Sequence, residues 1–169
     1  MRGIEVDGAL RIGERWTIGG SAAYADAEIT KALNESVPLR FLGVTDAKGF
    51  EFPLVPKLSG AAFAQYEAPA SSDRSWFARA DMTYIGKRYD SIANFAWVPA
   101  QFRTNLRGGV RADKWEVVAF VNNLFDDDTL EACRYNSDSA ADPFFFQLAS
   151  CEAVLPKKRH FGVTATMRF

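Results

Sequence analysis

Residues 159–169 read Arg-His-Phe-Gly-Val-Thr-Ala-Thr-Met-Arg-Phe. Every second position of this stretch is apolar, and the positions between are polar or small. The apolar positions are Phe161, Val163, Ala165, Met167 and Phe169. Because successive side chains of a β-strand point to opposite sides, this period predicts a strand with one apolar and one polar face. We expect the strand to continue to residue 169.

The same period recurs in six earlier stretches. They are residues 3–11, 16–24, 57–67, 76–87, 101–112 and 114–123. Each is close to the ~9–11 residues with which a tilted strand crosses a bilayer. Since helical periods are absent, we expect an all-β chain, an antiparallel up-and-down meander of about seven transmembrane strands.

The connections between these stretches alternate in length. Short turns are expected at residues 13–15, 68–75 and 113, and long connections at residues 27–56, 88–100 and 124–158. Aromatic residues lie near the ends of the apolar faces, at Trp16, Tyr24, Trp76, Tyr84 and Trp115. Short turns at one end of the strands, long loops at the other end and girdles of aromatic residues are typical of membrane β-barrels. A soluble meander with one buried face also alternates, but it does not require this sorting of the connections.

Composition is compatible with this interpretation. The 169 residues include 20 Lys or Arg and 21 Asp or Glu, so the formal net charge is -1. This balance excludes a strongly basic nucleic-acid-binding protein and an acidic disordered tail. Mean hydropathy is -0.14, and no run approaches the ~18 apolar residues of a membrane-spanning helix. Barrel strands alternate, so their average hydropathy is unremarkable.

The sequence contains no recognisable catalytic or metal-binding motif. His160 is the single histidine and Cys133 and Cys151 are the two cysteines, which is too few for a four-ligand zinc site. No Ser-His-Asp arrangement, P-loop or GxGxxG motif is present, so we expect no enzyme and no cofactor. The first six residues have no apolar segment of the kind found in signal peptides. We therefore expect a cytosolic chain or one whose start is missing.

Several motifs occur in a characteristic order. Residues 121–126 read Val-Asn-Asn-Leu-Phe-Asp, residues 156–163 read Pro-Lys-Lys-Arg-His-Phe-Gly-Val, and residues 164–169 end on Phe169. They resemble, in turn, the end of the penultimate strand, the start of the last strand and the closing strand of TonB-dependent outer-membrane receptors. Residues 3–6 (Gly-Ile-Glu-Val) and 55–60 (Val-Pro-Lys-Leu-Ser-Gly) resemble two earlier strand segments of that family.

The resemblance covers essentially the whole chain and implies a place in a larger fold. The family has a 22-stranded barrel whose lumen holds an N-terminal plug. Seven strands ending at Phe169 correspond to its last third, with short turns periplasmic and long connections external. The sequence departs from the family in having Lys157-Lys158 where Gly-Arg is usual, and no plug, TonB box or signal peptide. Residues 1–169 are thus expected to be one C-terminal barrel segment.

The resemblance also implies a function. The chain would supply barrel wall and external loops to an active transporter for a ferric siderophore, cobalamin or an oligosaccharide. Implied partners are the outer-membrane bilayer, the remaining barrel and plug, the barrel-assembly machinery, and the TonB complex acting through the plug. Two alternatives remain. One is a complete barrel of about eight strands with a structural or adhesive role, whose eighth strand would lie in residues 39–45 or 50–55. The other is a soluble β-rich binding module.

Particular residues acquire expected roles from this frame. The alternating residues Phe161, Val163, Ala165, Met167 and Phe169 match the assembly signal of outer-membrane barrels. Cys133 and Cys151 lie in the longest external connection, where an oxidising surface permits a disulfide. Candidate ligand contacts are Phe144, Phe145 and Phe146, with Tyr89 and Trp97 in the preceding loop. A small apolar cluster that folds the loop is the simpler interpretation of the three phenylalanines.

Arg103, Arg107 and Arg111 are expected on the luminal face of one strand. They would attract an anionic substrate, contact the plug or, as we favour, pair with carboxylates on adjacent strands such as Asp81 or Glu116. Residues 126–128 are three consecutive aspartates. They lack the further spaced ligands of a calcium site, so we interpret them as a solvated start of a loop.

Overall fold

The computed structural model describes residues 1–31, 46–138 and 148–169. All regular secondary structure in these residues is β-strand, which confirms the predicted fold class. Within the same part of the chain, no helix is long and apolar enough to cross a membrane.

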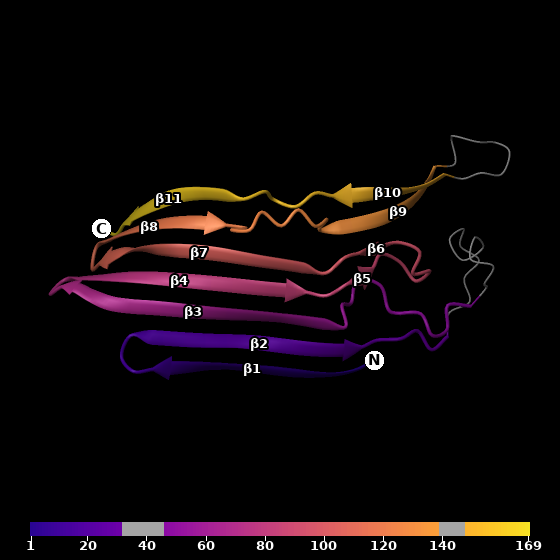
Figure 1. Ribbon diagram of the computed structural model, residues 1–169, viewed down its shortest axis with the longest axis horizontal. Helices are drawn as coiled ribbons and strands as arrows, with labels where there is room; N and C mark the ends of the chain where they lie inside the picture. The colour runs from indigo at the N-terminus through magenta and orange to yellow at the C-terminus, as the bar shows by residue number, and fades with distance from the viewer. Residues whose placement is uncertain (32–45, 139–147) are drawn as a thin grey trace.

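Seven strands form one antiparallel sheet (Figure 1). They are β1 (Arg2–Ile12), β2 (Trp16–Asp26), β3 (Leu58–Ser71), β4 (Arg74–Ile85), β7 (Gln101–Ala112), β8 (Trp115–Asn122) and β11 (His160–Met167). Their spatial order, β1-β2-β3-β4-β7-β8-β11, follows the chain, as in an up-and-down meander. All seven strands predicted from the sequence are present.

The two ends of the sheet differ in their connections (Figure 1). Tight turns at residues 13–15, 72–73 and 113–114 define what we call the turn end, and the long connections define the loop end. Gly13 has a φ of 62°, a conformation that glycine adopts without steric cost. The second turn is shorter than expected, because the β3–β4 ladder passes Pro69 with a register shift and continues to Ser71. Proline is tolerated at such an irregularity.

Two hairpins at the loop end were not expected. β5 (Arg88–Tyr89) pairs with β6 (Trp97–Val98), and β9 (Ala132–Asp138) pairs with β10 (Leu148–Val154). β5 and β6 are too short to show a period, and β9 has polar residues at consecutive positions. Periodicity therefore could not reveal either hairpin.

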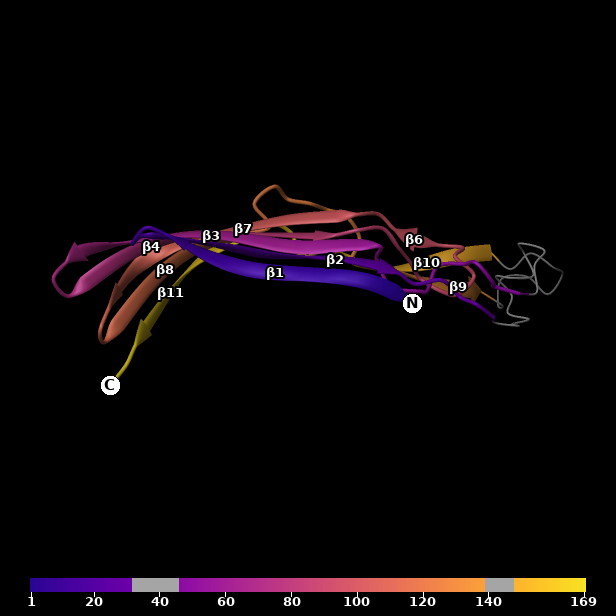
Figure 2. The ribbon, with the colours of Figure 1, turned by 90° about the horizontal axis from the view of Figure 1, so that it is seen from below.

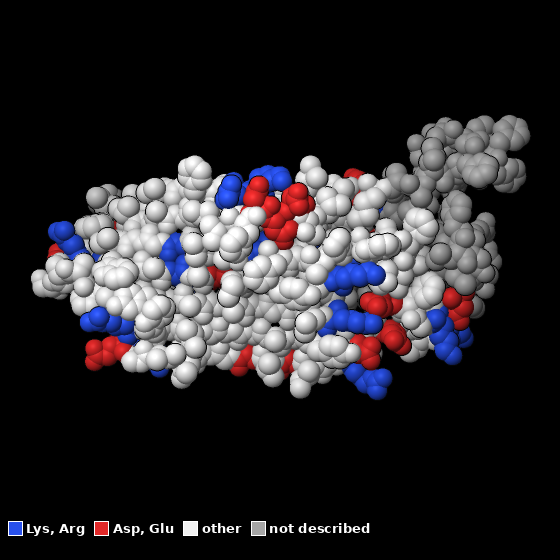
Figure 3. All heavy atoms as spheres, viewed as in Figure 1, with Lys and Arg blue, Asp and Glu red and all other residues white. Residues whose placement is uncertain are grey.

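Register places apolar side chains together on one side of the sheet, the outward face. Ile4 lies opposite Tyr24, Trp16 opposite Tyr66, and Val117 opposite Ala165. Many of these side chains are exposed, including Ile4 (67%), Leu10 (59%) and Phe161 (82%). Figure 3 shows a surface that is mostly uncharged between the turns and the loops. The other side, the inward face, carries the charged residues of the same strands.

The sheet is curved rather than flat (Figure 2). Among the described strands, β1 pairs only with β2 and β11 only with β8, so both are open edges. Residues 50–55 contribute no strand to the sheet, and Glu51 makes an isolated bridge with Glu28. Residues 39–45, the other candidate for an eighth strand, lie outside the described residues. Within the described residues the sheet is therefore an open, seven-stranded one and not a closed eight-stranded barrel.

A small apolar cluster holds the first two long connections together. Ile29, Ala47 and Ala93 are buried, and Phe50, Ile92 and Phe95 pack against them. Asn94 joins the connections, because its amide oxygen accepts the Glu51 N–H at 2.8 Å and its amide nitrogen donates to the Glu51 carbonyl at 2.9 Å. The described parts of these two connections are thus held together by contacts of their own.

Candidate functional site

The outward face carries an aromatic belt at the turn end, formed by Trp16, Tyr66, Trp76 and Trp115. The Tyr66 ring lies between two others, with its centroid 4.9 Å from that of Trp16 and 5.0 Å from that of Trp76. The Arg74 guanidinium lies 5.7 Å from the centre of the Trp115 ring. Aromatic residues with a polar edge suit the boundary between hydrocarbon and water.

A second belt lies at the loop end, formed by Tyr24, Tyr84, Phe102 and Phe161. Tyr84 pairs directly with Phe102 in the β4–β7 register. Tyr24 follows Trp16 by eight positions along β2, which is about 26 Å along a strand and about 20 Å across a bilayer at a tilt of ~40°. The side chains between the belts are mostly small or aliphatic, which fits a hydrocarbon environment, and the height of the band approaches the ~25 Å apolar band of outer-membrane barrels.

The inward face is charged, and several of its ionic groups are paired. Asp81 on β4 lies 2.7 Å from the Arg79 guanidinium and 3.8 Å from that of Arg107 on β7. The Arg79 guanidinium also lies 4.0 Å from the centre of the Phe63 ring. These groups come from three adjacent strands, so they link the sheet across its concave side.

A second ionic group lies nearer the turn end. Arg111 is 3.0 Å from Glu116 on β8 and 3.7 Å from Glu67 on β3. Glu67 also accepts the Ser75 hydroxyl at 3.2 Å. Both carboxylates that were expected as partners on adjacent strands are therefore found in ion pairs, Asp81 with Arg107 and Glu116 with Arg111.

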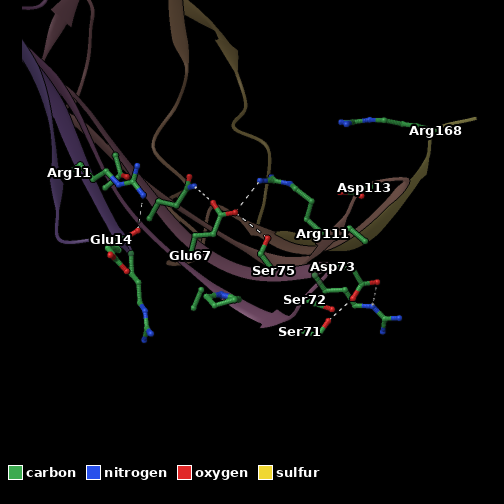
Figure 4. A pocket seen from close by; sticks show the side chains of 17 residues that line it. Arg11, Glu14, Glu67, Ser71, Ser72, Asp73, Ser75, Arg111, Asp113 and Arg168 are labelled. Atoms are coloured by element: carbon green, nitrogen blue, oxygen red, sulfur yellow. Dashed lines mark hydrogen bonds and ion pairs between the residues drawn. The ribbon is translucent and has the colours of Figure 1, made fainter.

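A hollow of about 880 Å³ opens beside Arg111. Figure 4 shows Arg11, Glu67, Arg111 and Arg168 on the inner side of the curved sheet, around this space. Its lining mixes arginines and carboxylates and includes few apolar side chains. Such a surface suits a polar protein partner or water better than an apolar ligand.

Arg103 differs from the other two arginines because its partner comes from a loop. Its guanidinium lies 2.9 Å from the carboxylate of Glu131, and Arg88 donates to the Glu131 main-chain carbonyl. Gln101 donates to the Leu130 carbonyl beside them. Burial, and then the neighbouring charge of Arg103, lower the pKa of Arg88, while Glu131 opposes the shift. The cluster fixes the start of the longest connection to β5 and β7.

Tyr89 and Trp97, two of the candidate ligand contacts, are brought together on the β5–β6 hairpin, where they pair directly. Lys87 lies with them, its Nζ atom 4.4 Å from the centre of the Tyr89 ring and 4.8 Å from that of Trp97. Lys87 was not among the residues predicted from the sequence. Lys87 and Tyr89 are two residues apart, so in an extended strand their side chains lie on the same face. This spacing is the sequence signal that could have predicted their contact.

The three aspartates at residues 126–128 form part of a corner after β8. Asn123 is buried, with φ of 53°, and its side chain bonds the Asp127 main chain in both directions at 2.8 and 2.9 Å. Asp127 accepts the N–H groups of Phe102 and Thr129, each at 2.9 Å. Burial alone would raise the pKa of Asp127, but the hydrogen bonds from Thr129 and Phe102 outweigh it and hold the pKa below its ordinary value. Among the described residues no group of side chains is arranged to hold a metal ion.

The remaining predicted residues are placed as follows. Cys133 and Cys151 are joined by a disulfide, with Cα atoms 5.5 Å apart, across the β9–β10 hairpin. Phe144, Phe145 and Phe146 lie outside the described residues. The outward residues of the edge strand β11 are exposed, including Phe161 (82%) and Met167 (66%). The strand ends at Met167 and not, as expected, at residue 169, and Phe169 beyond it is exposed.

An apolar outward band between two aromatic belts, with an ion-paired inward face, defines the wall of a membrane β-barrel. The family described as "TonB dependent receptor-like, beta-barrel" matches residues 1–124, and the chain belongs to it. A solved structure of similar fold is the siderophore receptor PiuA from Acinetobacter baumannii, with a TM-score of 0.67 and 23% identity. The match covers 96% of this chain and 21% of that structure. Among curated proteins none matches this sequence.

Proposed function

We propose that residues 1–169 are wall and external loops from the C-terminal part of a TonB-dependent transporter in the outer membrane. Membership of the receptor family carries this proposal. The similar solved structure supports it, since the match covers 96% of this chain and 21% of that receptor. The strand order, which follows the chain as in an up-and-down barrel, supports it as well. The open edges β1 and β11 would pair with the remaining barrel strands, because unpaired backbone groups are costly in lipid.

The substrate we favour is a ferric siderophore, with cobalamin and an oligosaccharide as the alternatives. Support comes from the related structure, PiuA, which is a siderophore receptor. In this proposal the plug of the receptor fills the lumen against the inward face, and the TonB complex acts on the plug. The charged hollow beside Glu67 and Arg111 has the polarity expected of a plug contact.

The test is uptake by the receptor that carries this chain. Cells starved for iron and expressing the receptor should accumulate radiolabelled ferric siderophore, and deletion of the receptor or of TonB should abolish the accumulation. Cobalamin and oligosaccharide uptake are measured in the same cells. Uptake of no substrate, or uptake that does not need TonB, would refute the transporter.

A separate experiment tests the proposal that residues 1–169 are the C-terminal segment of a longer receptor. We expect the reading frame upstream of Met1 to encode a plug and earlier strands, whereas a signal peptide directly before Met1 would support a separate small barrel. Expressed alone, residues 1–169 should not show the heat-dependent gel mobility of a closed barrel. Robust barrel mobility of the isolated chain would contradict the proposal.

The exposed outward residues of β11 support a further role as the signal for the barrel-assembly machinery. An edge strand presents unpaired backbone groups that another strand recognises. Removal of Phe169 should lower the amount of receptor in the outer membrane, while Thr166→Ala on the inward face should not. Equal amounts for both variants would argue against the signal.

A further inference from the structure

Lys87 is an exposed cation held between two aromatic rings on the β5–β6 hairpin. Its ammonium group donates to the Tyr89 hydroxyl at 2.9 Å and lies over the rings of Tyr89 and Trp97. No ion pair joins it to a carboxylate within the described residues. By contrast, Lys57 at the same end of the sheet lies 2.9 Å from Glu51. Lys87 therefore keeps donors and positive charge available.

The contacts of the hairpin, rather than alternation continued from β4, show which way this cluster points. Arg88 pairs with Val98, and Arg88 contacts Glu131, whose carboxylate binds the inward residue Arg103. The side of the hairpin that carries Arg88 and Val98 therefore faces inward, and Val98 is 1% exposed. Tyr89 and Trp97 occupy the next positions on each strand, so they point outward, and Trp97 is 52% exposed.

The cluster also has a definite level relative to the membrane band. Lys87 follows Tyr84 of the loop-end belt by three residues, which is about 10 Å along an extended strand and about 7 Å along the membrane normal at a tilt of ~40°. The headgroup region on each side of the hydrocarbon core is about 5–8 Å deep. An outward-facing cluster at this height meets lipid headgroups, whereas a substrate entering the lumen passes on the other side of the sheet.

We propose that Lys87, Tyr89 and Trp97 bind the phosphate group of a lipid in the outer leaflet. The ammonium group of Lys87 would donate to the phosphate oxygens, since Tyr89 occupies only one of its three donors. The Trp97 ring has an apolar body for the acyl boundary and an N–H donor for the headgroup. The inference rests on the membrane position in the proposed function, and it is independent of the transported substrate.

The test uses the whole receptor that carries this chain, purified from outer membranes in a non-ionic detergent. Native mass spectrometry follows binding of lipid A with two phosphates and of the same lipid after removal of the phosphates. Lys87→Gln and Trp97→Ala should each weaken binding of the phosphorylated lipid about fivefold. Lys87→Arg should preserve it, and the control Lys57→Gln, which changes a cation already paired with Glu51, should bind like the wild type.

Heat-dependent gel mobility of each variant verifies that the barrel is intact. Equal binding of phosphorylated and dephosphorylated lipid A by the wild type would overturn the proposal, as would unchanged binding in Lys87→Gln. Such a result would leave Lys87 with only its contacts to the two rings. Substrate uptake should be unaffected in Lys87→Gln. A receptor with phosphate-dependent lipid binding but no uptake of any substrate would contradict the transporter and not the lipid site.

Discussion

The outward and inward faces of the seven-stranded sheet are built from alternate residues of the same strands, yet they share almost no chemistry. On the outward face, from the turn-end belt to the loop-end belt, there is no Lys, Arg, Asp or Glu within the described strands. On the inward face, Asp81 bridges two arginines and Arg111 contacts two glutamates. Backbone pairing is the same for both faces, so the difference reflects what each face touches.

The contrast between the faces shows that alternation along each strand matches two different environments, an apolar one on the outward face and a polar one on the inward face. A soluble meander needs one buried face, but here the apolar face is exposed in the chain by itself, with Val6 at 59% and Val163 at 69%. Exposed apolar surface of this extent requires a covering, and two aromatic belts at its borders identify that covering as lipid. The inward face has paired charges because it faces water or protein.

The largest effect should come from placing a charge on the wrong face. Ala61 and Ala62 are consecutive residues in the middle of β3, opposite Thr83 and Met82 respectively. Ala62→Arg puts a guanidinium into the hydrocarbon and should destabilise the receptor by about 2–4 kcal/mol. Urea unfolding in lipid vesicles measures the change.

Ala61→Arg is the matched control, since it adds the same charge to the inward face and should cost much less. Similar losses for the two variants would mean that the faces do not differ in their surroundings.

A smaller effect is expected from the packing of neighbouring strands. A Cβ atom at Gly109 would overlap the Val117 carbonyl oxygen and lie 2.9 Å from the Val118 Cα, both backbone atoms that cannot move independently. Gly109→Ala should therefore destabilise the β7–β8 pair by about 1–3 kcal/mol. Gly8→Ala has open space within 4 Å and should be neutral. The same unfolding measurement compares them, and equal stability of both variants would show that β7 and β8 are not packed as described.

Removing one inward carboxylate should have a still smaller effect. Asp81→Asn takes the negative charge from Arg79 and Arg107, and half-exposed pairs of this kind contribute about 1 kcal/mol. Asp7→Asn, at an inward position opposite Ser21 that has no ion pair within the described residues, should change little. If Asp7→Asn lowered the free energy of unfolding as much as Asp81→Asn does, the ion pairs across β3, β4 and β7 would not contribute specifically to stability.

The smallest effect concerns the corner after β8 and depends on pH. Because the pKa of Asp127 is held below its ordinary value of about 3.9, the carboxylate stabilises the corner fully above that value. The contribution is lost as the pH falls through the lowered pKa of the folded state. Hydrogen exchange of the Phe102 and Thr129 amides should accelerate as the pH falls below about 4, beyond its intrinsic pH dependence. Asp127→Asn should remove this extra acceleration, and its persistence in that variant would assign it to another group.

Much of the sheet could be predicted from the sequence, because strand alternation is a local property. The pairs Arg107 with Asp81 and Arg111 with Glu116 could be expected for the same reason, since adjacent strands bring their partners together. Arg103 could not be matched with Glu131, because that partner comes from a loop whose path no period describes. The position of Lys87 over Trp97 likewise depends on the register of a two-residue hairpin.

The central claim is that alternate residues of each strand face lipid and lumen. It is tested most directly by placing a nitroxide at each position of β4, Arg74–Ile85, in the intact receptor with Cys133 and Cys151 left as a disulfide. Collision with oxygen, which concentrates in lipid, should be high at Ala78, Ala80 and Met82, and collision with a water-soluble nickel complex should be high at Arg79, Asp81 and Thr83. A profile without this alternation, or with water access on both faces, would contradict the claim.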